Sequence, residues 1–117
     1  MEKIFDYFDN SDFAATVCDK DGTVVYQNAI SRQNDGNAVG RNLFKCHSPK
    51  TREKIQSMID TGKNNTYEII KEGKHFLIHH SPWLNDASGK VAGLIELSIP
   101  LPDTYPLFDR DKKKQEA

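Results

Sequence analysis

The sequence predicts an α+β domain, in which a five-stranded, mostly antiparallel sheet carries short helices and one longer helix on one face. Three observations support this prediction. Five segments have the alternating, β-branched and aromatic pattern of strands. Between the second and third of them lies one capped helical segment in otherwise polar, glycine-containing sequence. The length of 117 residues suffices for one hydrophobic core and indicates a single domain.

Residues 1–10 are predicted to form a short amphipathic helix, because Ile4, Phe5 and Phe8 share one face. So short a helix is unstable alone in water. Its apolar side must therefore pack on its own sheet or form a homodimer interface through residues 2–9.

The first predicted hairpin joins residues 13–19 and 23–28 through a turn that ends at Gly22. The polar stretch 29–42 supports one or two short helical turns. A longer helix then begins at Ser48 and Pro49, since serine is a favoured cap and proline is tolerated at the first helical position.

Gly62 is expected to end this helix, whose buried stripe consists of Ile55, Met58 and Ile59. Three strands follow, at residues 65–71, 74–84 and 91–101. The last of these is the most apolar and should lie at the sheet centre. The predicted organisation is thus helix 1–10, domain 11–101, and a proline-rich, charged tail 102–117.

Composition excludes several classes of partner. The net charge of −1 provides no basic face for nucleic acid. No apolar run approaches the ~20 residues that span a bilayer, and the N-terminus lacks the regions of a signal peptide. We therefore expect a cytoplasmic protein in which Cys18 and Cys46 are reduced thiols.

Several motifs, in order, resemble the PAS domain family over roughly residues 10–100. The stretch VCDKDGTVVYQNAIS resembles its first hairpin, VGRNLF the segment before its long helix, and HSPWLNDASGKVAGLIELS its closing hairpin. CHSPKTREKIQSMIDTGK together with GKHFLIHHSPWL is similar to a bacterial subset that carries Cys-His-Pro-Pro before this helix.

The resemblance implies a sensory domain that binds a small molecule or a cofactor such as haem or flavin, or that mediates protein contacts. PAS domains that are covalently linked to an output domain commonly continue from their last strand into a signalling helix. Here Pro100 and Pro102 preclude a continuing helix, so we expect output through a protein partner or a change of assembly.

A pocket is expected between the sheet and the helices. The residues predicted to bind a ligand or cofactor there are His47, His80, Cys46, Phe44, Ile55, Ile59, Ile78 and Leu94. Haem is the leading named candidate, with His47 as ligand of the iron. The partial positive charge at a helix start keeps a histidine neutral and would favour the Cys46 thiolate. The simpler alternative is that His47 is a polar loop residue at the helix entrance.

Two forms of cofactor attachment are disfavoured. Covalent haem needs Cys-x-x-Cys-His, and residue 43 is leucine. Leu43 also occupies the place of the reactive cysteine in the light-sensing LOV motif. On the strand 74–84, Phe76, Ile78 and His80 share one face and His79 lies on the other. The register that the PAS resemblance implies, counted back from Pro82, turns the first face towards the pocket and His79 away from it.

No catalytic motif is present in the sequence, and adjacent residues such as Cys46 and His47 tend to direct their side chains apart. We therefore expect no enzyme activity. The leading hypothesis is a ligand-binding sensor in which ligand entry shifts the helix that starts at Ser48. The alternatives are a ligand-free interaction or dimerisation module and a thiol redox sensor acting through Cys46.

Overall fold

The computed structural model of the chain describes residues 7–46, 48–85 and 87–111, and of Cys46 it describes the backbone alone. In chain order the elements are β1 (Ala14–Asp19), β2 (Val24–Gln27), α2 (Ala29–Asp35), α3 (Leu43–Cys46), α4 (Pro49–Thr61), β3 (Asn65–Lys71), β4 (Lys74–Leu84) and β5 (Val91–Leu101). The predicted α+β class is confirmed. The predicted helix 1–10 lies largely outside the described residues, and residues 7–10 form turns.

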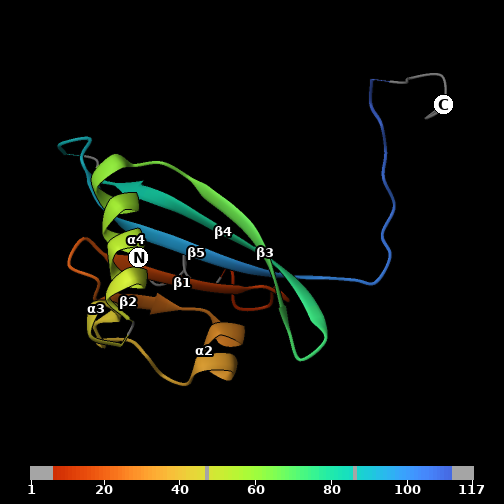
Figure 1. Cartoon of the computed structure of the whole chain (residues 1–117), viewed down its shortest axis with the longest axis horizontal. Helices are drawn as coiled ribbons and strands as arrows, with labels where there is room; N and C mark the ends of the chain where they lie inside the picture. Colours follow the sequence, from red (N-terminus) through yellow and green to blue (C-terminus); the bar gives the residue numbers. More distant parts are fainter. Residues whose placement is uncertain (1–6, 47, 86, 112–117) are drawn as a thin grey trace.

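The sheet has the strand order β2-β1-β5-β4-β3, and all of its neighbours pair antiparallel. β5 therefore lies at the centre, as its apolar composition predicts. In Figure 1, α4 crosses one face of the sheet, while α2 lies beside the β2 end of it. The helices therefore lie over one face of the sheet, which we call the concave face (Figure 1).

The long helix begins and ends at the predicted residues. The Ser48 side chain accepts a hydrogen bond from the Thr51 amide, Pro49 occupies the first turn, and Gly62 ends the helix in the left-handed conformation. Ile55 and Ile59 are buried, whereas Met58 is only partly buried. The predicted stripe therefore consists of two core residues with Met58 at its margin.

The hydrophobic core lies between α4 and the central strands. Cys18, Ile55, Ile59 and Leu94 form it, with Leu43, Phe44, Met58 and Val91 packed against it. Beside this core, β5 approaches β1 so closely at Gly93 that an added Cβ would lie 1.9 Å from the Cys18 carbonyl oxygen. The indole Nε1 of Trp83 donates to that same oxygen at 2.9 Å.

A fully buried residue, Asn28, caps α2 and connects it to the N-terminal segment. Its Oδ1 accepts hydrogen bonds from the amides of Ala15 and Ser31, at 2.9 and 3.1 Å. Its Nδ2 donates to the carbonyl oxygens of Phe8 and Phe13, both at 2.9 Å. One carboxamide therefore holds together β1, α2 and residues 8–13.

β5 contains Pro100, which pairs with Phe76 of β4. The pairing of β5 with β1 ends at Ser98, so the missing N–H of Pro100 faces no ladder on that side. Beyond Leu101 the chain leaves the sheet as an extended tail (Figure 1). Among the described residues, no helix has the length and apolar character needed to cross a membrane.

Candidate functional site

A row of polar residues crosses the concave face of the sheet. The Cα register aligns one residue from each strand: Asn65, His80, Glu96, Thr16 and Gln27, from β3 to β2. Directly paired residues on antiparallel strands point to the same face. We call these five residues the polar row.

Apolar side chains border the polar row on the α4 side, where Leu94 pairs with Cys18. Ile78 of β4 pairs with Tyr67 of β3 on the other side. The row is thus a polar line across a largely apolar floor. Such a line is a place where a bound molecule meets hydrogen-bonding groups.

The central pair of the row is His80 and Glu96. His80 Nε2 and Glu96 Oε2 lie 2.8 Å apart. The His80 side chain is 9% exposed and that of Glu96 47% exposed, so the carboxylate is the part that reaches solvent. The other ring nitrogen, Nδ1, is buried without a hydrogen-bond partner among the described residues. The Tyr67 ring lies beside the imidazole, with centroids 5.8 Å apart.

Thr16 and Gln27, the residues of the polar row on β1 and β2, are connected to α2 through Ser31, which is fully buried. The Ser31 hydroxyl lies 2.6 Å from Thr16 Oγ1 and accepts from Gln27 Nε2 at 3.0 Å. Gln27 also donates to the Gly36 carbonyl and accepts from the Ala38 amide. Its carboxamide is therefore committed to holding the end of α2 against the sheet.

A cavity of about 380 Å³ lies over this floor. Its walls come from β1, β2, β4, β5, α4 and the segment from Asp35 to Leu43, with these lining residues: Thr16, Cys18, Val24, Gln27, Asp35, Ala38, Arg41, Leu43, Ile55, His80, Leu94 and Glu96. An adjoining hollow of about 220 Å³ shares Thr16, Asp35 and Glu96 with it. The cavity lies at the small end of the range for ligand pockets, roughly 300–1,000 Å³.

The structure brings together some of the residues predicted for the site. His80, Ile55 and Leu94 line the cavity, and Ile78 lines the adjoining hollow. Their roles in binding are still predictions. His47 lies outside the described residues, as does the side chain of Cys46.

Phe44 and Ile59 face a different hollow, near Lys20 and Asp21. The Phe44 ring packs at the hairpin turn, where a Cβ on Gly22 would lie 2.9 Å from its Cδ2. Ile59 belongs to the hydrophobic core.

Sequence reasoning missed Glu96, Thr16 and Gln27 as residues of the site. The alternation of β5 places Glu96 on the same face as the apolar Leu94, which was a usable signal. The alignment of Thr16 with Glu96 depends on the register between β1 and β5, which no local pattern reports.

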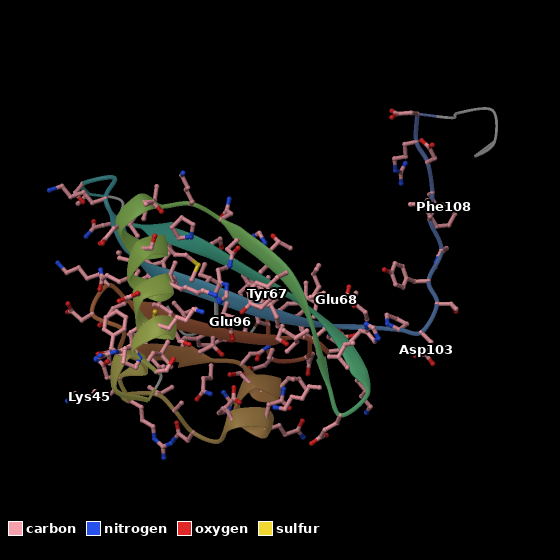
Figure 2. All side chains as sticks on the ribbon, in the orientation of Figure 1. Lys45, Tyr67, Glu68, Glu96, Asp103 and Phe108 are labelled. Atoms are coloured by element: carbon pink, nitrogen blue, oxygen red, sulfur yellow. The ribbon has the colours of Figure 1, made fainter. Side chains whose placement is uncertain are left out.

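Burial changes the ionisation of two groups near the floor. Burial raises the pKa of the Cys18 thiol, so that the group stays protonated at neutral pH. Burial, and after it the negative charge of Glu96, raises the pKa of the Tyr67 phenol. Figure 2 shows Tyr67 and Glu96 together over the middle of the sheet.

His80 does not fit the role of a haem ligand. His80 Nε2 is hydrogen-bonded to Glu96, and its Nδ1 is shut off inside the protein, so neither nitrogen is free for iron. Within the described part of the chain, no group of three or more His, Cys, Asp or Glu side chains could hold a metal ion. His47, the predicted ligand of the iron, lies outside the described residues.

Several solved structures share the fold. The PAS domain of histidine kinase ThkA is 23% identical, with a TM-score of 0.62 over 74% of this chain and 97% of that one. A Vibrio cholerae VqmA dimer, described in the absence of its target DNA, is 21% identical, with a TM-score of 0.69 over 92% of this chain and 54% of that one.

VqmA bound to DPO is 18% identical, with a TM-score of 0.68 over 88% of this chain and 58% of that one. This chain therefore spans little more than half the length of VqmA. No curated protein matches the sequence. A family model, that of the PAS fold, matches residues 8–105, from the turns before β1 into the tail. The chain accordingly belongs to the PAS family of sensory domains.

Proposed function

We propose that this chain is a PAS sensor that binds a compact, largely apolar molecule in the cavity over the polar row. The observation that carries the proposal is the pair His80 and Glu96 on the cavity floor, whose Nε2 and Oε2 lie 2.8 Å apart. The exposed carboxylate of Glu96 would accept a hydrogen bond from an N–H or O–H group of the ligand. The apolar walls from Leu43, Ile55 and Leu94 would cover the rest.

The size of the cavity supports this class of ligand. About 380 Å³ favours a molecule smaller than most drugs. A structure of the same fold, VqmA, is bound to DPO, which makes DPO a reasonable first test compound here. The proposal includes no catalytic step and no nucleic-acid or membrane contact by this chain, whose net charge is −1.

Signal output is proposed to follow from movement of the cavity walls. Leu43 belongs to α3 and Ile55 to α4, so a ligand that contacts both would favour one packing of these helices on the sheet. A protein partner, or the second subunit of a dimer, would detect the change. We place this signalling in the bacterial cytoplasm.

The experiment has two parts. Freshly purified protein is denatured, and any released small molecule is identified by mass spectrometry. The full chain is then titrated with DPO and followed by amide NMR. We expect shifts at Thr16, His80 and Leu94, which are lost in Glu96→Gln. An exposed control, Glu53→Gln on α4, should leave them unchanged.

The proposal fails if nothing is released and if neither DPO nor any other compact, largely apolar compound shifts the amide resonances of residues that line the cavity. That result would favour the alternative, a ligand-free interaction module. Haem stays a prediction that depends on His47, and a visible absorption spectrum of His47→Ala beside the natural protein tests it. Redox sensing through Cys46 likewise stays a prediction, tested by alkylation of that thiol near neutral pH.

A further inference from the structure

We propose that the tail, residues 102–111, adds as an extra strand to the free edge of β3 in a second copy of this chain, so that two copies exchange tails. This inference concerns an interaction surface and does not depend on the cavity. It rests on the tail's exposed apolar side chains, the spacing of its prolines, the open edge of β3 and the reach of the chain.

The tail presents large apolar side chains to solvent. Tyr105 is 64% exposed, Leu107 91% and Phe108 69%. Figure 2 shows Phe108 on the tail, well away from the sheet. Three large apolar residues within four positions are unusual for a segment that stays exposed to solvent. They indicate that a partner covers this segment.

The prolines of this region all fall at even positions: Pro100, Pro102 and Pro106. In an extended strand the N–H groups of alternate residues point to opposite edges. Residues 103, 105, 107 and 109 therefore keep a complete set of donors along one edge, while proline interrupts the other. A strand of this kind pairs on one side and stops further growth on the other, as proline does in natural edge strands.

β3 is an edge strand of the sheet and supplies a free backbone edge. It joins β4 through a two-residue turn in which Glu72 and Gly73 have φ of 54° and 78°, and Lys71 pairs with Lys74. The turn directs the backbone groups of Lys71 towards β4. Because the direction alternates along a strand, residues 66, 68 and 70 direct theirs to the free edge.

These two edges match in an antiparallel register. Leu107 is placed opposite Glu68, and Tyr105 opposite Ile70. The N–H and C=O groups of these two tail residues then face the N–H and C=O groups that β3 directs to its free edge. Ile70 is 67% exposed, and Tyr105 would cover it. Phe108 then lies opposite Tyr67, which is 44% exposed. Aromatic and aliphatic cross-strand pairs of this kind stabilise sheets.

The reach of the chain favours pairing with a second copy. Ile70, His75 and Leu101 lie in one row across β3, β4 and β5. A strand beyond β3 is three spacings from β5, about 14 Å. Tyr105 is four residues beyond Leu101, and four extended residues span at most about 14 Å. The straight path is filled by β4 and β3, and any path around them is longer than about 14 Å. In one copy Tyr105 comes only as far as a hollow that it lines with Glu68 and His75, so strand pairing with a second copy is favoured over pairing within one chain.

The first test is the mass of the full chain in solution, measured by light scattering over a concentration series. We expect a dimer at high protein concentration. Leu107→Pro removes a donor from the pairing edge and should weaken the dimer by roughly tenfold or more. Thr104→Pro adds a proline on the edge that is already interrupted. It should leave the dissociation constant of the dimer nearly unchanged. Both positions lie outside the folded core.

The second test is a disulfide that can form only between copies. One batch carries Tyr67→Cys and another Phe108→Cys, each with Cys46→Ser, and the two are mixed under mild oxidation. The proposed register places these positions directly opposite, within the span of a disulfide. We expect a linked dimer that forms much faster than with Glu68→Cys, whose side chain points to the opposite face of the sheet.

Three results would each overturn the proposal. One is a monomer at every concentration. Another is equal sensitivity of the dimer to the two proline variants. The last is linking of Phe108→Cys that shows no preference between Tyr67→Cys and Glu68→Cys.

Discussion

His80 and Glu96 face each other on adjacent strands with Nε2 and Oε2 2.8 Å apart, while Nδ1 of the same imidazole is buried without a partner among the described residues. A buried polar atom without a hydrogen bond costs about 1–3 kcal/mol. The chain therefore keeps at its cavity floor a residue that is poorly suited to stability alone. This relationship leads to the first prediction.

His80→Phe should leave the free energy of unfolding unchanged or raise it by about 1 kcal/mol, because phenylalanine fills a similar volume without an unpaired nitrogen. His80→Ala should lower it by about 2–3 kcal/mol, because it leaves a cavity. Urea denaturation of the three proteins checks this. A loss of stability in His80→Phe as large as that in His80→Ala would show that the contact with Glu96 stabilises the fold.

Tyr67 should titrate above its ordinary pKa of 10.0. A raised pKa in the folded protein means that the neutral phenol is favoured there, so the associated stability is complete below pH 10 and is lost as the pH rises through the folded value. The Cζ resonance of Tyr67, followed by NMR between pH 8 and 12, measures it. Glu96→Gln should lower the midpoint part of the way, since burial is the larger cause. A midpoint at or below the ordinary value of 10.0 for the tyrosine pKa would contradict the prediction.

Cys18 should react slowly with thiol reagents. Its side chain is 3% exposed, and burial raises the pKa of its thiol, which lowers the thiolate fraction. In Cys46→Ser protein, the reaction with a disulfide reagent at pH 8 should be at least about tenfold slower in the native state than in urea, where the thiol is accessible. Equal rates in the two conditions would place Cys18 outside the core.

Gly93→Ala should lower the free energy of unfolding by about 3 kcal/mol or more, because the new Cβ would lie 1.9 Å from the Cys18 carbonyl oxygen, and backbone must move. Trp83→Phe, which removes the indole donor to that oxygen, should cost only about 1 kcal/mol. Thermal and urea unfolding measure both. If the double variant recovered the stability lost in Gly93→Ala, the crowding would come from the indole at 2.5 Å and not from the backbone.

The fold was largely predictable because its signals are local. Ser48, Pro49 and Gly62 mark the ends of α4 within the sequence itself. The turn at Gly73 joins two strands that are neighbours in the chain, so their pairing follows from turn geometry. The alternation of β4 likewise needs no knowledge of other strands.

The site was less predictable because it depends on contacts between distant segments. Thr16 and Glu96 meet only once β1 lies beside β5. Phe44 was expected in the pocket, but the short helix α3 was not foreseen, and its ring packs at Gly22 instead. His47, on which the haem hypothesis depended, lies outside the described residues.

The carboxamide of Asn28 makes four hydrogen bonds and is 0% exposed, so no lone pair or proton on it is left for water. Phe8, at one end of this network, is 20 residues from Asn28 in the chain. Opening the segment 8–13 would leave the Nδ2 protons without acceptors and free the carboxamide to turn, which weakens the cap that its Oδ1 provides to α2. In hydrogen exchange, the amides of Ala15 and Ser31 should therefore open together with a single free energy, as one cooperative unit that joins the N-terminal segment to the wall of the cavity.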